Sequence, residues 1–314
     1  MGILIYITYI LIDTIGNYSV QSPYVRHSFK GFKLFQLNNH QFLAPAKLNL
    51  GLKIVGKYAN GYHEINSIFC LIDLYDEIEI EITTNTQIKL IDHNYPWAVT
   101  DDLAYKAALA LQNYTKTNQG AIIKIHKNIP TQAGMGGGSS DAATVLIALN
   151  HLWKTKLSLE ELTSIGVKLG ADVPFFIFGH NAYAQGIGEI CEDFPIKTHY
   201  FIVVKPDSGC NTKQIFESLN LPNDYIGGKF SKEQLIESME NDLQQAACRL
   251  NPQLQQLQNA LRKYGNPIMT GSGSALFLSY TNYEIAKKVA AKLKIRYNSL
   301  LVRSLDTSPM YKFI

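Results

Sequence analysis

The segment PTQAGMGGGSSDAA, residues 130–143, is the part of this chain whose composition most clearly indicates chemistry. Four glycines and two serines fill six of the seven positions from Gly134 to Ser140. Glycine lets main-chain N–H groups approach an anion without a Cβ in the way. An apolar helix pattern runs from Ser140 to about Trp153, and the N-terminus of a helix also attracts negative charge. The segment is therefore predicted to bind a polyphosphate.

This glycine-rich segment differs from two better-known phosphate-binding loops. A Walker A loop needs Lys and then Ser or Thr directly after its last glycine, but Gly138 is followed by Ser139 and Ser140. A dinucleotide-binding loop would need glycine in place of Ser139 and an acidic residue about twenty residues further on, after another strand. A flexible surface linker is a third alternative, which the clear strand and helix patterns on either side disfavour.

Three charged residues are candidates for phosphoryl transfer, which needs positive charge near the moving group and often a carboxylate that accepts a proton. Lys47 stands at a strand start in APAKLNL, and Lys127 shortly precedes Pro130. Asp172 lies in LGADVPFF, where a charge next to apolar residues is costly unless it has a partner.

Purely structural explanations also exist for Asp172, for Lys47 and for the nearby Asn49. Asp172 could be a turn residue whose carboxylate accepts backbone N–H groups. Lys47 could be a surface lysine, and Asn49, two residues further along the same strand face, could be polarity at a sheet edge. Taken singly, none of these residues decides the function.

Composition and charge favour a small ligand over a macromolecular partner. The chain has 314 residues, of which 46% are apolar, so it can bury a substantial core. Its net charge of +3 includes no block of basic residues, so a nucleic-acid partner has no electrostatic support. The cysteines have neither the spacing of a zinc site nor the density of a disulfide scaffold, which favours a cytoplasmic location: Cys70, Cys191, Cys210 and Cys248.

Residues 1–40 are interpreted as an N-terminal extension without chemistry of its own. The apolar run at residues 3–12 is too short to span a bilayer, and it lacks the basic start of a secretory signal. We therefore expect no membrane partner, and we expect activity to survive deletion of residues 1–40.

Regular patterns begin near Phe42. Leu48, Leu50 and Leu52 alternate with Asn49 and Gly51, as expected of a half-buried strand. Further strands are expected at 65–74, 77–83, 121–125 and within 268–278, and helices at 102–115, after Ser158, after Ser231, after Asn251 and at 283–293. Because strands and helices mix without a repeating alternation, the sequence predicts an α+β fold in two domains that divide near residues 190–200.

Three segments, in order, resemble the motifs of the GHMP kinases: residues 44–50, 130–143 and 269–277. The resemblance covers roughly residues 41–314. It implies an ATP-binding domain at 41–190 and a second domain at 191–314, with mixed and antiparallel sheets and helices packed on them. Three more segments, GYHEINSIF, GADVPFF and GIGE, are similar to the members of that family that phosphorylate the 2-hydroxyl of 4-diphosphocytidyl-2-C-methyl-D-erythritol in the non-mevalonate isoprenoid route.

The resemblance implies a role for each candidate. Asp172 would be the general base toward the 2-hydroxyl, Lys47 would keep it ionised and stabilise charge, and Asn49 would hold the methylerythritol portion. Lys127 would lie near ATP, and Mg²⁺ would bridge the phosphates without a committed side-chain ligand. The segment implied to bind ATP comprises Pro130, Gly134, Gly136, Gly137, Gly138, Ser139 and Ser140.

The resemblance also implies a cytosine site. His63 would read the edge of the base, Tyr62 and Phe216 would sandwich its ring, and Thr212 would lie close by. The alternative is that Tyr62 and His63 belong to a hairpin turn and that Phe216 belongs to the core.

Two other functions stay open at this point. Another GHMP kinase would act on mevalonate, phosphomevalonate or homoserine, none of which has a nucleobase for the GYHE segment to read. A non-catalytic sensor would not need both Lys47 and Asp172. Two departures from the family pattern, Met135 for leucine and Gln185 for arginine, leave the interpretation unchanged. We expect a monomer or a weak homodimer.

Overall fold

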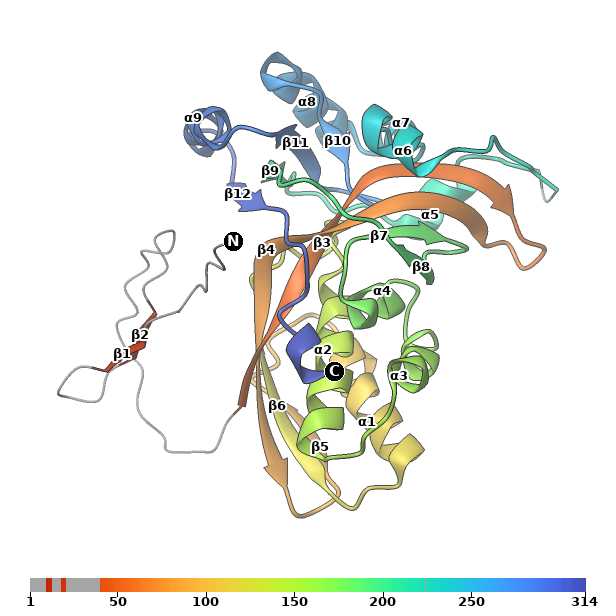
Figure 1. Cartoon of the computed structure of the whole chain (residues 1–314). Coiled ribbons are helices and arrows are strands. Elements are labelled where there is room, and N and C mark those ends of the chain that lie inside the picture. The colour runs from red at the N-terminus through yellow and green to blue at the C-terminus, as the bar shows by residue number, and fades with distance from the viewer. Residues whose placement is uncertain (1–9, 13–17, 21–39, 223) are drawn as a thin grey trace, which may run out of the picture. The chain divides into compact units, whose positions relative to one another are not determined.

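The computed structural model forms two compact units, residues Met1–Asn38 and Asn39–Ile314. In the first unit, β1 (Ile10–Ile12) pairs antiparallel with β2 (Tyr18–Val20). Most of the apolar run at 3–12 lies outside the described residues, which are 10–12, 18–20, 40–222 and 224–314. The account below concerns the second unit (Figure 1).

A mixed sheet forms one part of this unit. Its strand order is β5-β6-β4-β7-β8, and β3 pairs with β4. Only β5 and β6 are parallel among the paired strands described for this sheet. The bounds are β3 (His40–Lys57), β4 (His63–Thr83), β5 (Ile88–Ile91), β6 (Gly120–His126), β7 (Ala182–Gln185) and β8 (Ile190–Asp193).

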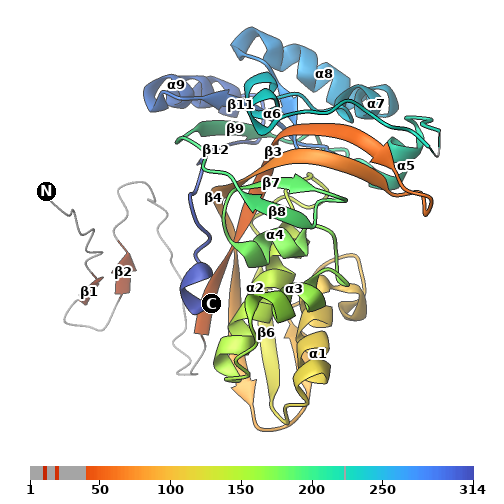
Figure 2. The ribbon, with the colours of Figure 1, turned by 45° about the vertical axis from the view of Figure 1, so that its right-hand side comes forward.

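Helices pack on this sheet around a buried helix, α2 (Gly137–Leu152), which contacts β3, β4, α1, α3 and α4. The two views in Figures 1 and 2 show this group of helices on one side of β6 and the lower part of β4. The other helices are α1 (Leu103–Thr115), α3 (Leu159–Gly166) and α4 (Val173–Phe178), and a 3₁₀ turn, η1, covers Val99–Asp101.

A second, antiparallel sheet has the strand order β10-β11-β9-β12. Its strands are β9 (Tyr200–Val204), β10 (Ile268–Met269), β11 (Leu276–Tyr280) and β12 (Ser299–Arg303). The helices of this part are α5 (Thr212–Glu217), α6 (Lys232–Ser238), α7 (Gln244–Leu250), α8 (Pro252–Leu261) and α9 (Tyr283–Lys294), with the 3₁₀ turn η2 (Arg262–Tyr264). The last 3₁₀ turn, η3 (Tyr311–Phe313), instead contacts α2 beside the first sheet. None of the helices in the described ranges has the length and apolar character needed to cross a bilayer.

The α+β fold class is confirmed, and the predicted division near residues 190–200 falls between β8 and β9, where the chain leaves one sheet for the other. Both sheets belong to the single unit Asn39–Ile314. The division into two domains therefore stays a prediction.

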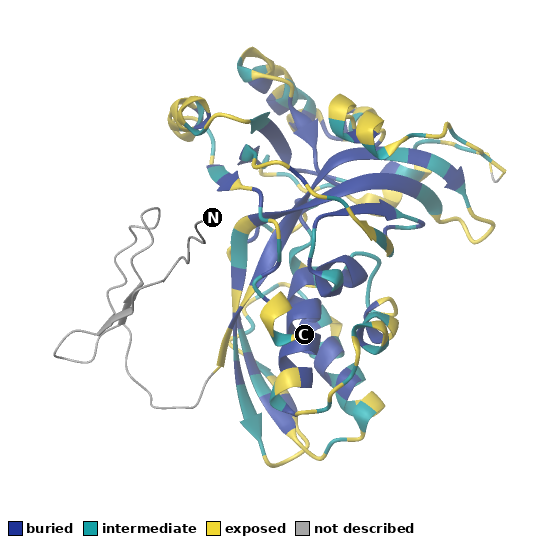
Figure 3. Cartoon of the chain, viewed as in Figure 1, coloured by how far each residue is buried: buried dark blue, intermediate teal, exposed yellow. Residues whose placement is uncertain are grey.

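The prediction that β3 is half-buried was wrong, because both of its faces are covered over its central part. Figure 3 shows the long β3–β4 pair as mostly buried. Lys47 and Asn49, which the alternation assigned to a solvent face, are 3% and 1% exposed. α2 and α6 both pack on β3, so Lys47 and Asn49 lie inside the molecule.

Two local predictions differ in detail from the structure. The strands expected at 65–74 and 77–83 are one strand, β4, whose pairing with β3 shifts register between Pro45 and Ala46. This bulge interrupts the alternation, which explains why the sequence suggested a break. α2 begins at Gly137, three residues before the predicted start, because Gly136 adopts the left-handed conformation at the N-cap. The helices predicted after Ser158 and Ser231 are confirmed, and each begins with a capping box, in which the serine and the residue three positions later exchange hydrogen bonds.

The C-terminal segment is attached to β4 through a buried amide. Asn181 accepts a hydrogen bond from Leu71 N at 2.8 Å and donates one to Leu305 O at 2.8 Å. Leu305 N donates to Leu71 O at 2.8 Å. Asn181 is 3% exposed, so water cannot readily replace these bonds.

We expect Asn181→Leu to lower the free energy of unfolding by about 2 to 4 kcal/mol, since it leaves a buried N–H and a buried C=O without this partner. Urea denaturation would measure the change. Asn259→Leu, the same substitution at an exposed position of α8, should change stability by about 0.5 kcal/mol or less. Equal effects of the two substitutions would contradict the structural role assigned to Asn181.

Candidate active site

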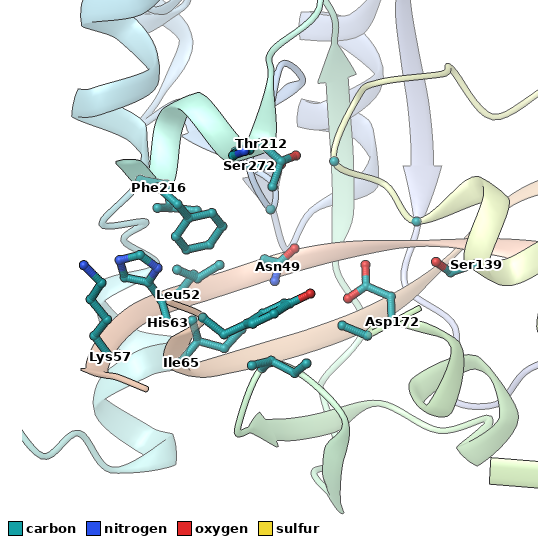
Figure 4. Close-up of a pocket in the computed structure, with 18 of the residues that line it drawn as sticks. Asn49, Leu52, Lys57, His63, Ile65, Ser139, Asp172, Thr212, Phe216 and Ser272 are labelled. Atoms are coloured by element: carbon teal, nitrogen blue, oxygen red, sulfur yellow. The ribbon is translucent and has the colours of Figure 1, made fainter. Parts of the chain in front are cut away.

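A cavity of about 920 Å³ is lined by residues from distant parts of the chain, between Lys47 and Ser272. Figure 4 shows His63 and Phe216 at one end and Asp172 with Ser139 at the other. Ten of the residues proposed from the sequence line this cavity: Lys47, Asn49, Tyr62, His63, Gly134, Gly136, Ser139, Asp172, Thr212 and Phe216. The other five, Lys127, Pro130, Gly137, Gly138 and Ser140, are absent from its described lining.

Lys47 is held from both its backbone and its side chain. Its N–H donates to Met135 O at 3.0 Å, which joins β3 to the glycine-rich segment. Its ammonium donates to Asn49 Oδ1 at 2.5 Å and lies 4.8 Å from the centre of the Phe69 ring. The alternative of a surface lysine is excluded, because Lys47 is buried.

Asp172 lies next to Lys47 in the wall of the cavity. Its Oδ2 lies 3.5 Å from Lys47 Nζ, and its side chain is 30% exposed. It occupies the N-cap position of α4, but in the part of the chain that the structure describes no cap hydrogen bond joins its carboxylate to the helix. The alternative of a turn aspartate that caps this helix is therefore not supported, and the carboxylate is open toward the cavity.

Asn49 connects Lys47 to two other segments. Its side-chain amide donates to Ser67 Oγ at 2.9 Å, and its backbone N–H donates to Thr270 Oγ1 at 3.0 Å. Thr270 in turn donates to Gly134 O at 3.1 Å. Thr270 is fully buried and was not singled out from the sequence; its place in the third family-like segment, residues 269–277, was the available signal.

The glycine-rich segment needs glycine where it meets the 270–274 loop and α4. Gly134 and Gly136 have φ of +74° and +72°, a conformation that L side chains rarely adopt. A Cβ at Gly134 would lie 2.1 Å from Thr270 O, and one at Gly136 would lie 2.8 Å from the Phe176 ring. Gly138 is different, since its Cβ would meet only Leu103 Cδ1 at 3.7 Å.

Lys127 lies beside the start of α2 and is paired with two carboxylates, Asp76 and Asp141. Burial lowers its pKa, but the two carboxylates outweigh burial and the pKa is raised, so the side chain stays protonated. Asp76 was missed from the sequence, where it is one of several acidic residues in residues 73–81.

Aromatic side chains form the far end of the cavity. The His63 and Phe216 rings have their centroids 4.9 Å apart at 31°, and Tyr62 is 59% exposed. Burial, and then the charge of Lys57, lower the pKa of His63, so its ring is neutral at pH 7. Its Nε2 is buried without a hydrogen-bond partner among the described residues. Thr212 Oγ1 lies 2.7 Å from Ser272 Oγ.

Oxygen atoms suited to a hard cation lie at the start of α2. Ser140 Oγ and Asp141 Oδ1 are buried and have no hydrogen-bond partner within the described ranges. Oxygen donors are the ligands that Mg²⁺ prefers. No cluster of three or more His, Cys, Asp or Glu residues suited to a metal is found in the described part of the chain.

Comparison with known proteins identifies the class of enzyme to which this chain belongs. Residues 102–180 match the model of the GHMP kinases N terminal domain. A solved 4-(cytidine 5'-diphospho)-2C-methyl-D-erythritol kinase superposes with a TM-score of 0.74 at 30% identity, covering 84% of this chain and 99% of the other. A homoserine kinase from Cytophaga hutchinsonii, 16% identical over 89% of this chain and 98% of its own, has a TM-score of 0.65 and shares the fold. These matches define a GHMP kinase.

More similar relatives identify the particular family within the GHMP kinases. A 4-diphosphocytidyl-2-C-methyl-D-erythritol kinase from Chromobacterium violaceum is 39% identical, and the alignment covers 87% of this chain and 97% of the relative. One from Ruthia magnifica is 41% identical over the same shares. The chain belongs to the family of 4-diphosphocytidyl-2-C-methyl-D-erythritol kinases.

We expect Gly134→Ala to weaken binding of a non-hydrolysable ATP analogue by at least ~10-fold, because the added Cβ forces the segment away from Thr270 and strains a positive φ. Titration calorimetry would measure the affinity. Gly138→Ala makes the same chemical change where space is available, and it should leave the affinity within about 3-fold. Similar losses in both variants would show that the contact with Thr270 is not what matters.

Proposed function

We propose that this protein transfers the γ-phosphoryl group of ATP to the 2-hydroxyl of 4-diphosphocytidyl-2-C-methyl-D-erythritol. The observation that carries the proposal is the 3.5 Å approach of Lys47 Nζ to Asp172 Oδ2 in a cavity that also contains Gly134 and Gly136. Family membership supports the choice of substrate.

Asp172 acts as the general base in this proposal. Its carboxylate is open to the cavity and can accept the proton of the 2-hydroxyl as the oxygen attacks the γ-phosphorus. The Lys47 ammonium lies 3.5 Å from that carboxylate and pairs with it. The same ammonium can stabilise negative charge on the phosphoryl oxygens during transfer. Asn49 fixes the ammonium through the 2.5 Å hydrogen bond and orients it.

The phosphates of ATP bind to the glycine-rich segment. Main-chain N–H groups at the start of α2 point their partial positive charge toward an anion. Mg²⁺, when bound with ATP, would neutralise phosphate charge, and the Ser140 hydroxyl and Asp141 Oδ1 are the protein oxygens that fit it.

The base of the acceptor binds at the aromatic end. Neutral His63 can donate or accept a hydrogen bond at the cytosine edge, and its unpartnered Nε2 leaves that capacity free within the described residues. The Phe216 ring lies tilted against the His63 ring, with centroids 4.9 Å apart, and Tyr62 is exposed beside the cavity. Mevalonate and homoserine have no ring to use this end.

The decisive experiment is a choice of acceptors. Purified protein with ATP and Mg²⁺ should phosphorylate the cytidylyl substrate with a kcat/KM at least ~100-fold above that for mevalonate, phosphomevalonate or homoserine, since unfilled aromatic contacts and unpaired polar groups penalise the smaller acceptors. Product mass and NMR of the phosphorylated carbon would identify the reaction. Preference for one of the smaller acceptors would refute the proposal.

We expect Asp172→Asn and Lys47→Ala each to lower kcat by at least ~100-fold, the lower end for a positioned general base, while the Kd for an ATP analogue stays within about 3-fold. Steady-state kinetics and calorimetry would measure the two quantities. Asp193→Asn, at the exposed end of β8, is the matched control and should be unaffected. Near-normal kcat in Asp172→Asn would remove Asp172 from the base role.

Phe216→Ala should raise KM for the cytidylyl substrate by ~10- to 100-fold and change kcat much less, because base stacking contributes about 1 to 3 kcal/mol to binding. Initial rates at varied acceptor concentration would test this. Phe230→Ala removes a ring that packs on another part of the core and is not part of the described cavity lining. A KM that responds equally in both variants would speak against a stacking site at Phe216.

A further inference from the structure

A buried group of three charged residues lies next to the active site but is not part of the described cavity lining: Asp76, Lys127 and Asp141. Asp76 is fully buried and Asp141 is 3% exposed. Two carboxylates and one ammonium in such a place are costly unless they are closely paired. The contacts of these three side chains show which segments of the chain they connect.

Asp76 accepts three hydrogen bonds from residues 127–129, which directly precede the glycine-rich segment. Its Oδ1 accepts hydrogen bonds from Asn128 N at 2.6 Å and from Ile129 N at 2.8 Å. Its Oδ2 accepts from Lys127 Nζ. Asn128 Nδ2 also donates to Tyr75 O, the residue before Asp76 on β4. The strand therefore fixes residues 127–129 directly before Pro130.

Lys127 continues the connection to the other end of the loop. Its Nζ donates to Asp141 Oδ2 at 2.6 Å, and Asp141 lies in the second turn of α2. A Cβ at Gly137 would lie 3.3 Å from Lys127 Nζ and 3.1 Å from Ile129 Cγ2. The first turn of α2 thus packs directly on the residues that Asp76 holds.

The three side chains form a clamp. The Lys127 ammonium contacts one carboxylate oxygen of Asp76 and one of Asp141. Its positive charge offsets the repulsion between the two buried carboxylates, so this pairing favours keeping the three groups together.

We propose that Asp76 is a positioning residue for nucleotide binding: through Asn128, Ile129 and Lys127 it fixes both ends of the glycine-rich segment at the spacing that the phosphates require. The inference rests on the proposed ATP site and deepens it. Lys127 is also part of this clamp. It supports nucleotide binding indirectly, because its ion pairs hold the glycine-rich segment in place. Asp76 itself touches neither substrate.

The test compares Asp76→Asn with Asp73→Asn. Asp73 lies on the same strand, and its carboxylate also accepts a backbone N–H, from Arg303 at 2.6 Å. Asp76→Asn should raise Kd for a non-hydrolysable ATP analogue and KM for ATP by at least ~10-fold, and kcat at saturating ATP should fall less than about 3-fold. Asp73→Asn should leave all three values near those of the unmodified protein.

Amide hydrogen exchange, measured on the unmodified protein, is a second test of the Asp76 contacts and needs no variant. Asn128 is an exposed residue, so its amide should exchange fast unless Asp76 holds it. We expect protection of the Asn128 and Ile129 amides, and a further slowing when the ATP analogue binds. Fast exchange at both amides would overturn the inference even if Asp76→Asn failed to fold.

The outcomes separate this inference from the proposed function. If the unmodified protein phosphorylates the cytidylyl substrate and Asp76→Asn binds ATP normally, the clamp is wrong and the function stands. If the unmodified protein binds the ATP analogue with the Asp76 dependence described but phosphorylates a different acceptor, the clamp stands and the proposed acceptor is wrong. A parallel loss in Asp73→Asn would indicate a general effect of β4 on stability and would also overturn the inference.

Discussion

The ion pair between Lys47 and Asp172 is the interaction on which the active-site account depends. A lysine that is 3% exposed must have partners for its charge, since desolvation of an ammonium is costly. Asp172, Asn49 and the face of Phe69 supply them. The pair therefore stabilises the fold by giving a buried ammonium a partner, and it serves the proposed chemistry by placing that ammonium next to a carboxylate that lines the cavity.

The position of the Lys47–Asp172 pair in the cavity depends on hydrogen bonds between segments that are far apart in the sequence. Thr270 accepts from Asn49 N, 221 residues away in the sequence, and donates to Gly134 O. Asn241 donates to Met269 O at 2.7 Å and Gly271 O at 2.8 Å, so the loop around Thr270 is itself fixed. β3, the glycine-rich segment and the 270–274 loop thus form one hydrogen-bonded network behind the cavity.

The glycine-rich segment and the two charged candidates could be singled out from the sequence, because glycine composition and an acid next to apolar residues are local signals; their roles stay predictions. It could not show that Lys47 is buried, since alternation along β3 records which residues are polar and not what covers them. Asp76 and Thr270 act through single oxygen atoms on segments far away, and such contacts leave no periodic pattern. The assignment of the cytosine-site residues came from the family resemblance and stays a prediction.

A crystal structure with the cytidylyl substrate and a non-hydrolysable ATP analogue tests the central claim most directly. The distances to measure run from the acceptor 2-hydroxyl to Asp172 Oδ and Lys47 Nζ. The account predicts both within hydrogen-bonding range, about 2.6 to 3.2 Å, with the γ-phosphate in line behind the hydroxyl oxygen. An acceptor bound with its 2-hydroxyl away from both side chains, or a triphosphate bound outside the glycine-rich segment, would contradict it.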